Sequence, residues 1–304
     1  MHAMTVKKQY LAAVLALFLG GTAQVYAQNT ALGFTRIDRN PRTSALAGAG
    51  AASNGNGAYG AFKNAAVLPS LQGMGEVFAG LQMWEMSNEV DKTTNLMAGA
   101  GFHFGKFGVA LGGVYQKGVP LGTFIPSDYL VSLGVAFRPI EKLSIGVNAR
   151  YAGQSFSQDA KVGGFSADVT LFSQITDNLS VMGGVACFGP QVKGSSASYS
   201  LPTHVDLAVA WKQPLGKMHR IEMMLDGEYD LSQSLAAAVG AEYVFDDLLF
   251  LRVGYRLAGE NAVIPSHLAL GMGVQFQGFR ADISYLTASP ILGNTLNVGA
   301  AFRF

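Results

Sequence analysis

The stretch Leu296-Asn297-Val298-Gly299-Ala300-Ala301-Phe302-Arg303-Phe304 alternates between two kinds of side chain. Its even positions are Leu, Val, Ala, Phe and Phe, whereas its odd positions are Asn, Gly, Ala and Arg. Successive side chains of an extended strand point to opposite faces. A period of two therefore predicts a strand with one apolar face and one polar or small face.

The aromatic end makes this strand resemble the terminal strand of bacterial outer-membrane barrels, whose last residue helps the assembly machinery to recognise the chain. The resemblance implies that Phe302 and Phe304 serve as an assembly signal. A strand of a soluble sandwich that ends with the chain is the alternative. This segment alone leaves that alternative open.

The composition is rich in apolar residues and poor in charge. Hydrophobic residues make up 49% of the 304 residues and charged residues 13%, about half the usual charged share. Past the N-terminus, no run of about 18 apolar residues predicts a transmembrane helix. Many short strands, each with one lipid-facing side, account for this composition, and 38 Gly favour turns and crowded barrel interiors. A formal net charge of +1 argues against nucleic acid as a partner.

The first 27 residues have the features of a signal peptide. Lys7 and Lys8 precede an apolar core, and the small-residue site Val25-Tyr26-Ala27 predicts cleavage before Gln28. The mature chain is therefore expected outside the cytoplasm. Cys187, the single cysteine, excludes an intrachain disulfide and a Cys-rich metal site, and is expected to be a small packed residue within a strand.

Residues 28–74 lack the alternation of barrel strands. The charge-dense segment Arg36–Arg42 is followed by small residues over Ser44–Ala52, and then by runs rich in Gly, Asn and Ala. A disordered leader is one interpretation. The stronger one is a compact plug, or hatch, whose small residues pack tightly and whose basic residues face acidic groups in a lumen.

This segment also carries a family resemblance. Its motifs resemble the N-terminal signature of the PorV/PorQ family, and the match continues near the C-terminus. The matching residues are Arg36, Asp38, Arg42, the run Ala45–Ala49, Asn64 with Ala66, Leu68-Pro69, Gly240–Asp247, Leu251–Arg256 and the closing strand. The chain departs from the family at Ala65, where Pro is usual, which concerns the hatch conformation more than the barrel.

The resemblance implies a fold and a setting. PorV/PorQ proteins are outer-membrane barrels of Bacteroidota, and they share the architecture of the FadL fatty-acid transporters, with fourteen strands and an N-terminal hatch. Arg36, Asp38, Arg42 and Asn64 would then be hatch residues. The expected domains are a signal peptide at 1–27, a hatch at 28–74 and an all-β, antiparallel transmembrane barrel at 75–304.

Strand signals recur at regular spacing from Gly75 onward. Apolar rows alternate with polar or small rows, and aromatic residues tend to begin or end each apolar row, as interfacial girdles do. About fourteen strands are predicted, at 75–87, 93–104, 107–116, 128–138, 142–152, 160–173, 178–188, 203–212, 219–230, 234–245, 249–257, 266–276, 278–286 and 295–304.

The connections between these strands alternate in length. Short turns such as Gln277-Gly278 alternate with longer segments such as 188–202 and 286–294. Short periplasmic turns and longer outer loops are typical of outer-membrane barrels, whereas a soluble sandwich has no reason to alternate in this way. The pattern therefore favours the barrel and places the C-terminus in the periplasm of a Gram-negative cell.

If the apolar rows face lipid, many charged residues face the lumen. Isolated charges there are costly, so they are expected to pair with each other or with the hatch, or to remain hydrated. A path for a ligand or ion is the alternative. The predicted lumen charge network consists of Arg138, Arg150, Glu222, Asp226, Glu228, Glu242, Arg252, Arg256, Arg280, Asp282 and Arg303.

Catalytic motifs are weak in this sequence. His204 near Asp206, and the dipeptide Ser266-His267, are the nearest pieces of a hydrolase site, but neither belongs to a nucleophile elbow. No metal-ligand cluster is visible in the sequence and no cofactor is expected. The protein is therefore not expected to be an enzyme.

Two functional hypotheses remain ahead of catalysis. The resemblance implies a non-enzymatic envelope partner, or shuttle component, linked to type IX protein secretion, with loops such as Val119–Pro126 and Val192–Pro202 as contact surfaces. The alternative is FadL-like passive transport of hydrophobic small molecules. Expected partners are outer-membrane lipids, the assembly machinery and other envelope or secreted proteins, with a hydrophobic ligand as a further candidate.

Overall fold

The computed structural model describes residues 30–85, 92–118, 120, 124–157, 160–194, 197–231, 234–259, 262–289 and 293–304. The predicted signal peptide at 1–27 lies outside these ranges. Among the described residues, no helix is long and apolar enough to cross a membrane.

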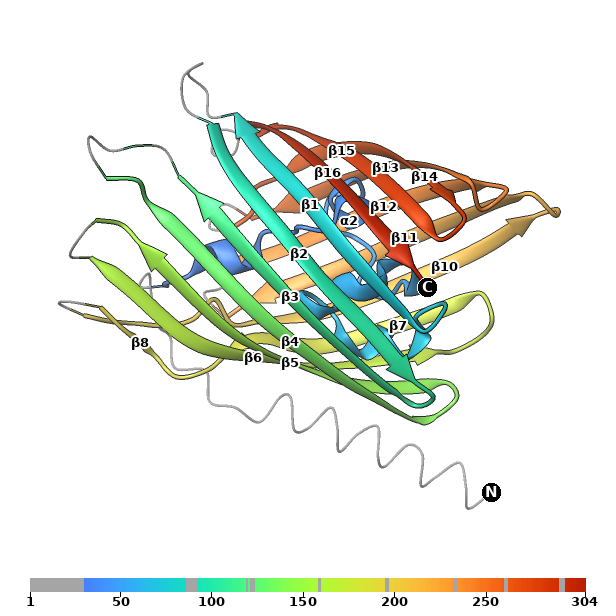
Figure 1. Cartoon of the computed structure of the whole chain (residues 1–304), viewed down its shortest axis with the longest axis horizontal. Helices are drawn as coiled ribbons and strands as arrows, with labels where there is room; N and C mark the ends of the chain where they lie inside the picture. Colours follow the sequence, from blue (N-terminus) through green and yellow to red (C-terminus); the bar gives the residue numbers. More distant parts are fainter. Residues whose placement is uncertain are drawn as a thin grey trace.

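Fourteen of the strands formed by the described residues close into one antiparallel barrel (Figure 1). Each strand pairs with its neighbours along the chain, and the last pairs with the first. The predicted fold class and strand number are therefore confirmed. The barrel strands are β1 Gly75–Glu85, β2 Lys92–Phe104, β3 Phe107–Lys117, β4 Ser127–Ile140, β5 Leu143–Ser155, β6 Lys161–Gln174, β7 Leu179–Phe188, β10 His204–Leu215, β11 His219–Asp230, β12 Ser234–Phe245, β13 Leu249–Ala258, β14 His267–Phe276, β15 Phe279–Ser289 and β16 Gly293–Arg303.

The outer surface of the barrel is apolar. Along β4, the exposed residues Tyr129, Val131, Leu133, Val135 and Phe137 alternate with buried residues that point inward. A closed barrel satisfies all its backbone hydrogen bonds between strands, and an apolar exterior matches hydrocarbon, so this surface suits a bilayer and not water.

The C-terminal strand β16 closes the barrel by pairing with β1. Phe302 lies opposite Val77, and the carbonyl oxygen of Phe304 accepts hydrogen bonds from the backbone N–H groups of Met74 and Gly75. The rings of Phe302 and Phe304 are exposed, and Phe304 lies 5.9 Å from the ring of Phe102. Both aromatic residues are thus on the outer surface, where their role as an assembly signal stays a prediction.

The two ends of the barrel differ in their connections. At one end, the short-turn end, Gln277 and Gly278 connect β14 to β15, and both have positive φ angles, as a tight hairpin turn requires. At the other, the loop end, residues 189–203 connect β7 to β10 and contain a small hairpin of β8 (Val192–Lys193) and β9 (Ser198–Tyr199). The sequence did not predict this hairpin. The predicted loop at 286–294 is shorter, because β15 continues to Ser289.

The segment before β1 lies inside the barrel (Figure 1). We call the described part of it, residues 30–74, the hatch. Three of its helical turns begin at residues whose side chain accepts a backbone N–H, namely Asn40, Ser53 and Asn64. The helical turns are η1 Gly33–Arg36, α2 Pro41–Ser44, η2 Asn54–Ala61 and η3 Ala65–Ser70.

Candidate functional site in the lumen

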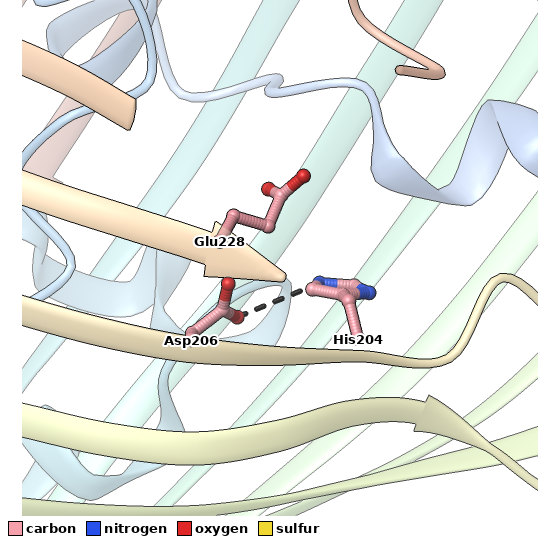
Figure 2. Close-up of side chains that lie close together, drawn as sticks. All are labelled: His204, Asp206 and Glu228. Atoms are coloured by element: carbon pink, nitrogen blue, oxygen red, sulfur yellow. Dashed lines mark ion pairs between the residues drawn. The ribbon is translucent and has the colours of Figure 1, made fainter. Parts of the chain in front are cut away.

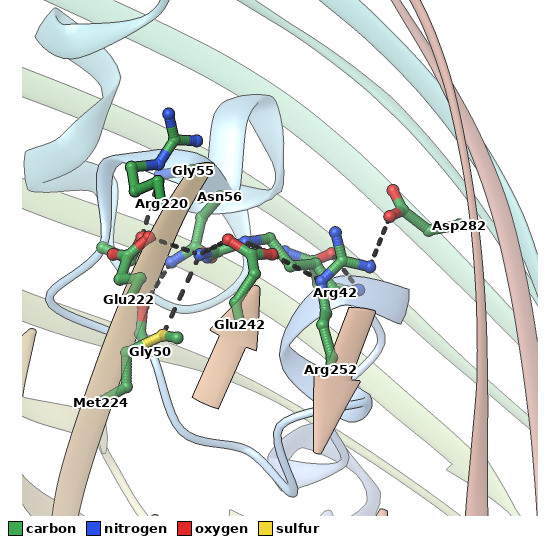
Figure 3. Close-up of polar contacts among 12 residues, drawn as sticks. Arg42, Gly50, Gly55, Asn56, Arg220, Glu222, Met224, Glu242, Arg252 and Asp282 are labelled. Atoms are coloured by element: carbon green, nitrogen blue, oxygen red, sulfur yellow. Dashed lines mark hydrogen bonds and ion pairs between the residues drawn. The ribbon is translucent and has the colours of Figure 1, made fainter. Parts of the chain in front are cut away.

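A buried ion-pair cluster joins the hatch to the wall toward the short-turn end of the lumen. Arg42, from α2, donates to both carboxylate oxygens of Glu242, at 3.0 and 2.9 Å, and to Glu222 at 3.2 Å (Figure 3). It also donates to the side-chain oxygen of Asn56, at 2.9 Å. Arg42, Glu222 and Glu242 are each 2% exposed, so the wall binds a hatch cation almost out of contact with water.

The cluster continues along the wall. Arg252 donates to Glu242 at 2.6 Å and to Asp282 at 2.7 Å, and Asp282 also pairs with Arg280. The guanidinium groups of Arg252 and Arg280 lie over the ring of Phe250, at 5.3 and 4.9 Å from its centroid. The structure thus joins four predicted lumen charges to Arg42 in one network. They are Glu242, Arg252, Arg280 and Asp282.

The protonation of the two buried hatch arginines follows from these surroundings. Burial alone would lower the pKa of Arg42, but Glu242 and Glu222 raise it above its ordinary value. The pKa of Arg39 is not raised in this way. Burial, followed by the charge of Arg150, lowers it to about 10. Both side chains remain cationic at neutral pH.

A second ion-pair cluster lies nearer the loop end. Arg36, from η1, pairs with Glu228 and Asp230 on β11, and Arg256 on β13 donates to Glu228 at 3.0 Å. Asp230 is a partner that the sequence analysis did not identify. It lies two residues after Glu228 on the same face of the strand, so the period-two pattern contained the signal.

Two further wall residues bind backbone groups of the hatch. Asp226 accepts from the N–H groups of Gly50 and Ala51, both at 2.9 Å. Asn148 donates to the carbonyl oxygen of Ala61 at 2.7 Å and accepts from the N–H of Ala65 at 3.2 Å. Proline has no N–H and could not make the last bond. The backbone N–H of Ala65 therefore supplies a contact between hatch and wall.

Arg150 belongs to a group that the sequence revealed in part. Its guanidinium pairs with Asp168, donates to the carbonyl oxygen of Phe62 and lies 3.4 Å from the sulfur of Cys187. Asp168 also accepts from the N–H of Cys187, at 2.8 Å, where the β6–β7 register shifts. Cys187 is buried as expected, but its positive φ of 55° places it at this irregularity and not in a regular ladder.

The remaining predicted residues lie outside these clusters. Asp38 accepts from the hydroxyl of Thr43 at 2.9 Å, and Asn64 donates to the carbonyl oxygen of Ala51 at 2.8 Å. At the short-turn end, Arg303 donates to Glu76 at 2.6 Å. Arg138 donates to Ser144, at 3.2 Å, and to Ser70 of the hatch. Glu76 was not predicted as a lumen charge.

A cavity of about 100 Å³ lies between the hatch and the wall, toward the loop end. One set of its lining residues is apolar and another is charged. We call it the upper cavity. The apolar set is Ile37, Ala47, Phe62, Trp84, Ala186, Ile264 and Leu286, and the charged set is Arg36, Asp38, Arg39, Lys63, Arg150, Asp206, Glu228 and Arg256.

Two other cavities lie at the ends of the barrel. One of about 280 Å³ at the short-turn end is lined by charged residues that include Lys212, Arg280 and Arg303. Another of about 320 Å³ lies under the loops, between the start of the hatch and Tyr199 of β9. More large apolar side chains line the upper cavity than line the cavity at the short-turn end.

Solved structures of channels resemble this arrangement of barrel and hatch. The toluene transporter TbuX of Ralstonia pickettii matches with a TM-score of 0.66 and 13% sequence identity, over 87% of this chain and 98% of TbuX. The chain has the fold of the FadL-type outer-membrane channels. A FadL homologue of Pseudomonas aeruginosa gives a TM-score of 0.57 at 11% identity, over 88% of this chain and 98% of its own.

A third structure with the FadL-type fold is the toluene transporter TodX of Pseudomonas putida. It matches with a TM-score of 0.53 and 13% identity, over 91% of this chain and 98% of TodX. No family model matches the chain, and no curated protein matches its sequence. At these identities the FadL-type likeness concerns the fold.

Proposed function

We propose that the protein is a non-enzymatic, hatch-gated channel for small, mainly apolar molecules in the outer membrane of a Gram-negative bacterium. The observation that carries this proposal is the upper cavity inside a FadL-type barrel, whose exposed surface is more apolar than polar and includes Phe62 and Trp84, although many charged side chains also line it. Small-molecule sites expose mainly apolar surface, with polar groups that fix the orientation of the ligand. The toluene transporters that share the fold support the same class of solute.

The volume of the upper cavity limits what it can hold. About 100 Å³ is the space of roughly three water molecules, and drug-sized ligands fill cavities several times larger. A solute much larger than a single small ring would need the hatch to move. The ion pairs of Arg36 and Arg42 help to hold the hatch in the observed position, so they contribute to the energy needed for that movement.

Filling the upper cavity is expected to abolish passage. Ala186 is buried and lines the cavity, so Ala186→Phe places a ring in the solute's space. Val185 precedes it on the opposite, outward face of β7, and Val185→Phe is the matched control. We expect cells that produce the protein to take up labelled toluene several-fold faster than cells without it, Ala186→Phe to return uptake to background, and Val185→Phe to leave it high.

The controls of this experiment decide the proposal. Folding of each variant is checked by the mobility of unheated barrels in gel electrophoresis. If cells that produce the protein take up toluene no faster than cells without it, the channel proposal is refuted for toluene-sized solutes. Equal uptake by wild type and a folded Ala186→Phe would refute the assignment of the upper cavity as the path.

A second candidate is an envelope partner of the PorV/PorQ type, linked to type IX secretion in Bacteroidota. The contacts of the N-terminal signature favour it: Arg36 and Arg42 are both committed to wall carboxylates, which keeps the lumen filled. Affinity purification from native outer membranes, followed by mass spectrometry of proteins and lipids, separates the candidates. Stoichiometric envelope proteins without an enriched apolar ligand would favour the partner role. An isolated barrel carrying such a ligand would favour the channel.

A further inference from the structure

We propose that His204, Asp206 and Glu228 form a binding site for a divalent transition-metal ion of the zinc type in the barrel wall (Figure 2). The ligand atoms of these three residues all lie within 4.8 Å of one another. The proposal does not depend on which molecule passes through the lumen. No metal cluster was predicted from the sequence, because Glu228 lies on a different strand from His204 and Asp206.

The sheet holds the three side chains in place. His204 and Asp206 are two residues apart on β10 and therefore point to the same face. Glu228 lies directly opposite Asp206 in the β10–β11 ladder. Directly opposed residues have Cβ atoms about 5 Å apart, so the backbone itself preorganises the cluster.

The hydrogen bonding of His204 selects the tautomer that binds metals. Its Nδ1 lies 2.8 Å from the carbonyl oxygen of Pro202, which can accept but not donate. Nδ1 therefore carries a proton, which leaves Nε2 as the ring nitrogen that can bind a metal. Metal-binding histidines are commonly oriented by such a bond from the other ring nitrogen to a carbonyl.

The separation of the first two ligand atoms fits one ion. Nε2 of His204 lies 3.5 Å from Oδ2 of Asp206. Zinc–nitrogen and zinc–oxygen bonds are about 2.1 Å long, so two ligands of a tetrahedral ion are separated by about 3.4 Å. One nitrogen and two carboxylate groups suit zinc and its neighbours better than magnesium or calcium, which prefer oxygen alone.

The third ligand is shared with the hatch. Arg36 and Arg256 both contact Oε1 of Glu228, and among the described residues no such bond reaches Oε2. Oε2 is thus the oxygen that can approach a metal. The two guanidinium groups would repel the ion and lower its affinity. Arg36 retains Asp230 as a partner when Glu228 turns toward the metal.

The upper cavity gives the site access and room. His204, Asp206 and Glu228 all line it. Its volume of about 100 Å³ exceeds that of a metal ion with one or two water ligands, each of which occupies about 30 Å³. Water can therefore complete a four-coordinate shell.

The test is zinc titration of the untagged full-length mature protein, folded in detergent and stripped with a chelator. We expect one Zn²⁺ per chain by calorimetry, with no competition from a large excess of Mg²⁺. His204→Gln is expected to weaken binding at least about tenfold, since it removes a direct ligand. His267→Gln is the matched control, because His267 lines the same cavity and its Nδ1 lies 2.9 Å from the carbonyl oxygen of Pro265, outside the three-residue cluster.

A variant that strengthens binding adds a second check. Arg256→Gln removes one of the two charges beside Glu228, so the zinc affinity is expected to rise several-fold. Equal zinc affinity in wild type, His204→Gln and Arg256→Gln would overturn the proposal, provided that all three migrate as folded barrels. So would the lack of saturable binding at one ion per chain.

X-ray absorption on the zinc-loaded wild type keeps the test independent of any variant. The proposal requires a shell with one imidazole nitrogen, oxygen ligands and no sulfur. A sulfur ligand would place the ion at Cys187 and overturn the assignment, as would a shell without imidazole.

Discussion

Arg42→Met is expected to release the hatch and to destabilise the barrel by about 3–5 kcal/mol, the usual cost of removing one partner from a buried ion pair. Methionine keeps much of the length of the side chain but leaves Glu222 and Glu242 without the hatch cation that both contact. Glu242 retains Arg252 at 2.6 Å, so Glu222 bears most of the loss. Urea unfolding followed by tryptophan fluorescence measures the stability, and conductance across a planar bilayer measures the opening of the lumen.

The same replacement at Arg138 is the control. Arg138 also faces the lumen and contacts the hatch, but its side chain donates to the hydroxyl groups of Ser144 and Ser70, so these bonds leave no buried carboxylate behind. We expect a cost of at most about 1 kcal/mol and no increase in conductance. Adding Glu222→Gln to Arg42→Met should recover part of the lost stability. Equal effects of Arg42→Met and Arg138→Met would contradict the view that the buried pairs anchor the hatch.

The barrel could be predicted because its determinants are local. The alternation of Tyr129, Val131, Leu133, Val135 and Phe137 with inward residues needs no knowledge of the partner strand. An outward apolar row fixes the face, and strand ends follow from turn residues. The end of β15 was missed because the segment between Leu286 and Ser289 includes a register shift, which the alternation does not reveal.

The site could be predicted as a set of residues but not as a set of contacts. Arg42 and Glu242 were both expected in the lumen, yet their pairing across 200 positions depends on the path of the hatch. That path is fixed by small residues and backbone hydrogen bonds, such as those to Asp226 and Asn148, which leave no periodic signal. Asp168 and Glu76 were missed, although both are buried and the alternation of their strands places them on the inward face.

The sequence contains enough information to predict the proposed metal cluster. The hairpin of β10 and β11 is centred on Lys217, and Asp206 and Glu228 each lie eleven positions from it. Residues equally far from the centre of a two-stranded hairpin lie opposite one another. A predicted turn at this position therefore implies the contact between Asp206 and Glu228, to which His204 adds the third ligand on the same face.

Gly254→Val is expected to displace the hatch by a steric route, with a loss of about 3 kcal/mol, at the upper end for overpacking. Gly254 and Gly240 are paired across β13 and β12, and together they make a depression in the wall that Leu46 of the hatch occupies. A Cβ atom at Gly254 would lie 2.1 Å from the carbonyl carbon of Leu46 and 2.5 Å from its Cα. These are backbone atoms, so no side-chain rotation relieves the clash and the hatch itself has to move.

Trypsin reports this displacement, because the cleavage sites Arg39 and Arg42 are buried in the closed state. Gly227→Val is the control: Gly227 shares the outward parity of Leu225 and Tyr229, and a Cβ atom there meets nothing closer than 3.9 Å. We expect rapid cleavage of the hatch in Gly254→Val with the barrel still folded, and resistance in Gly227→Val. Resistance of both variants would mean that the wall can yield at Gly254 while the hatch stays in place. The ion pairs of Arg36 and Arg42 would then dominate the position of the hatch over the packing of Leu46.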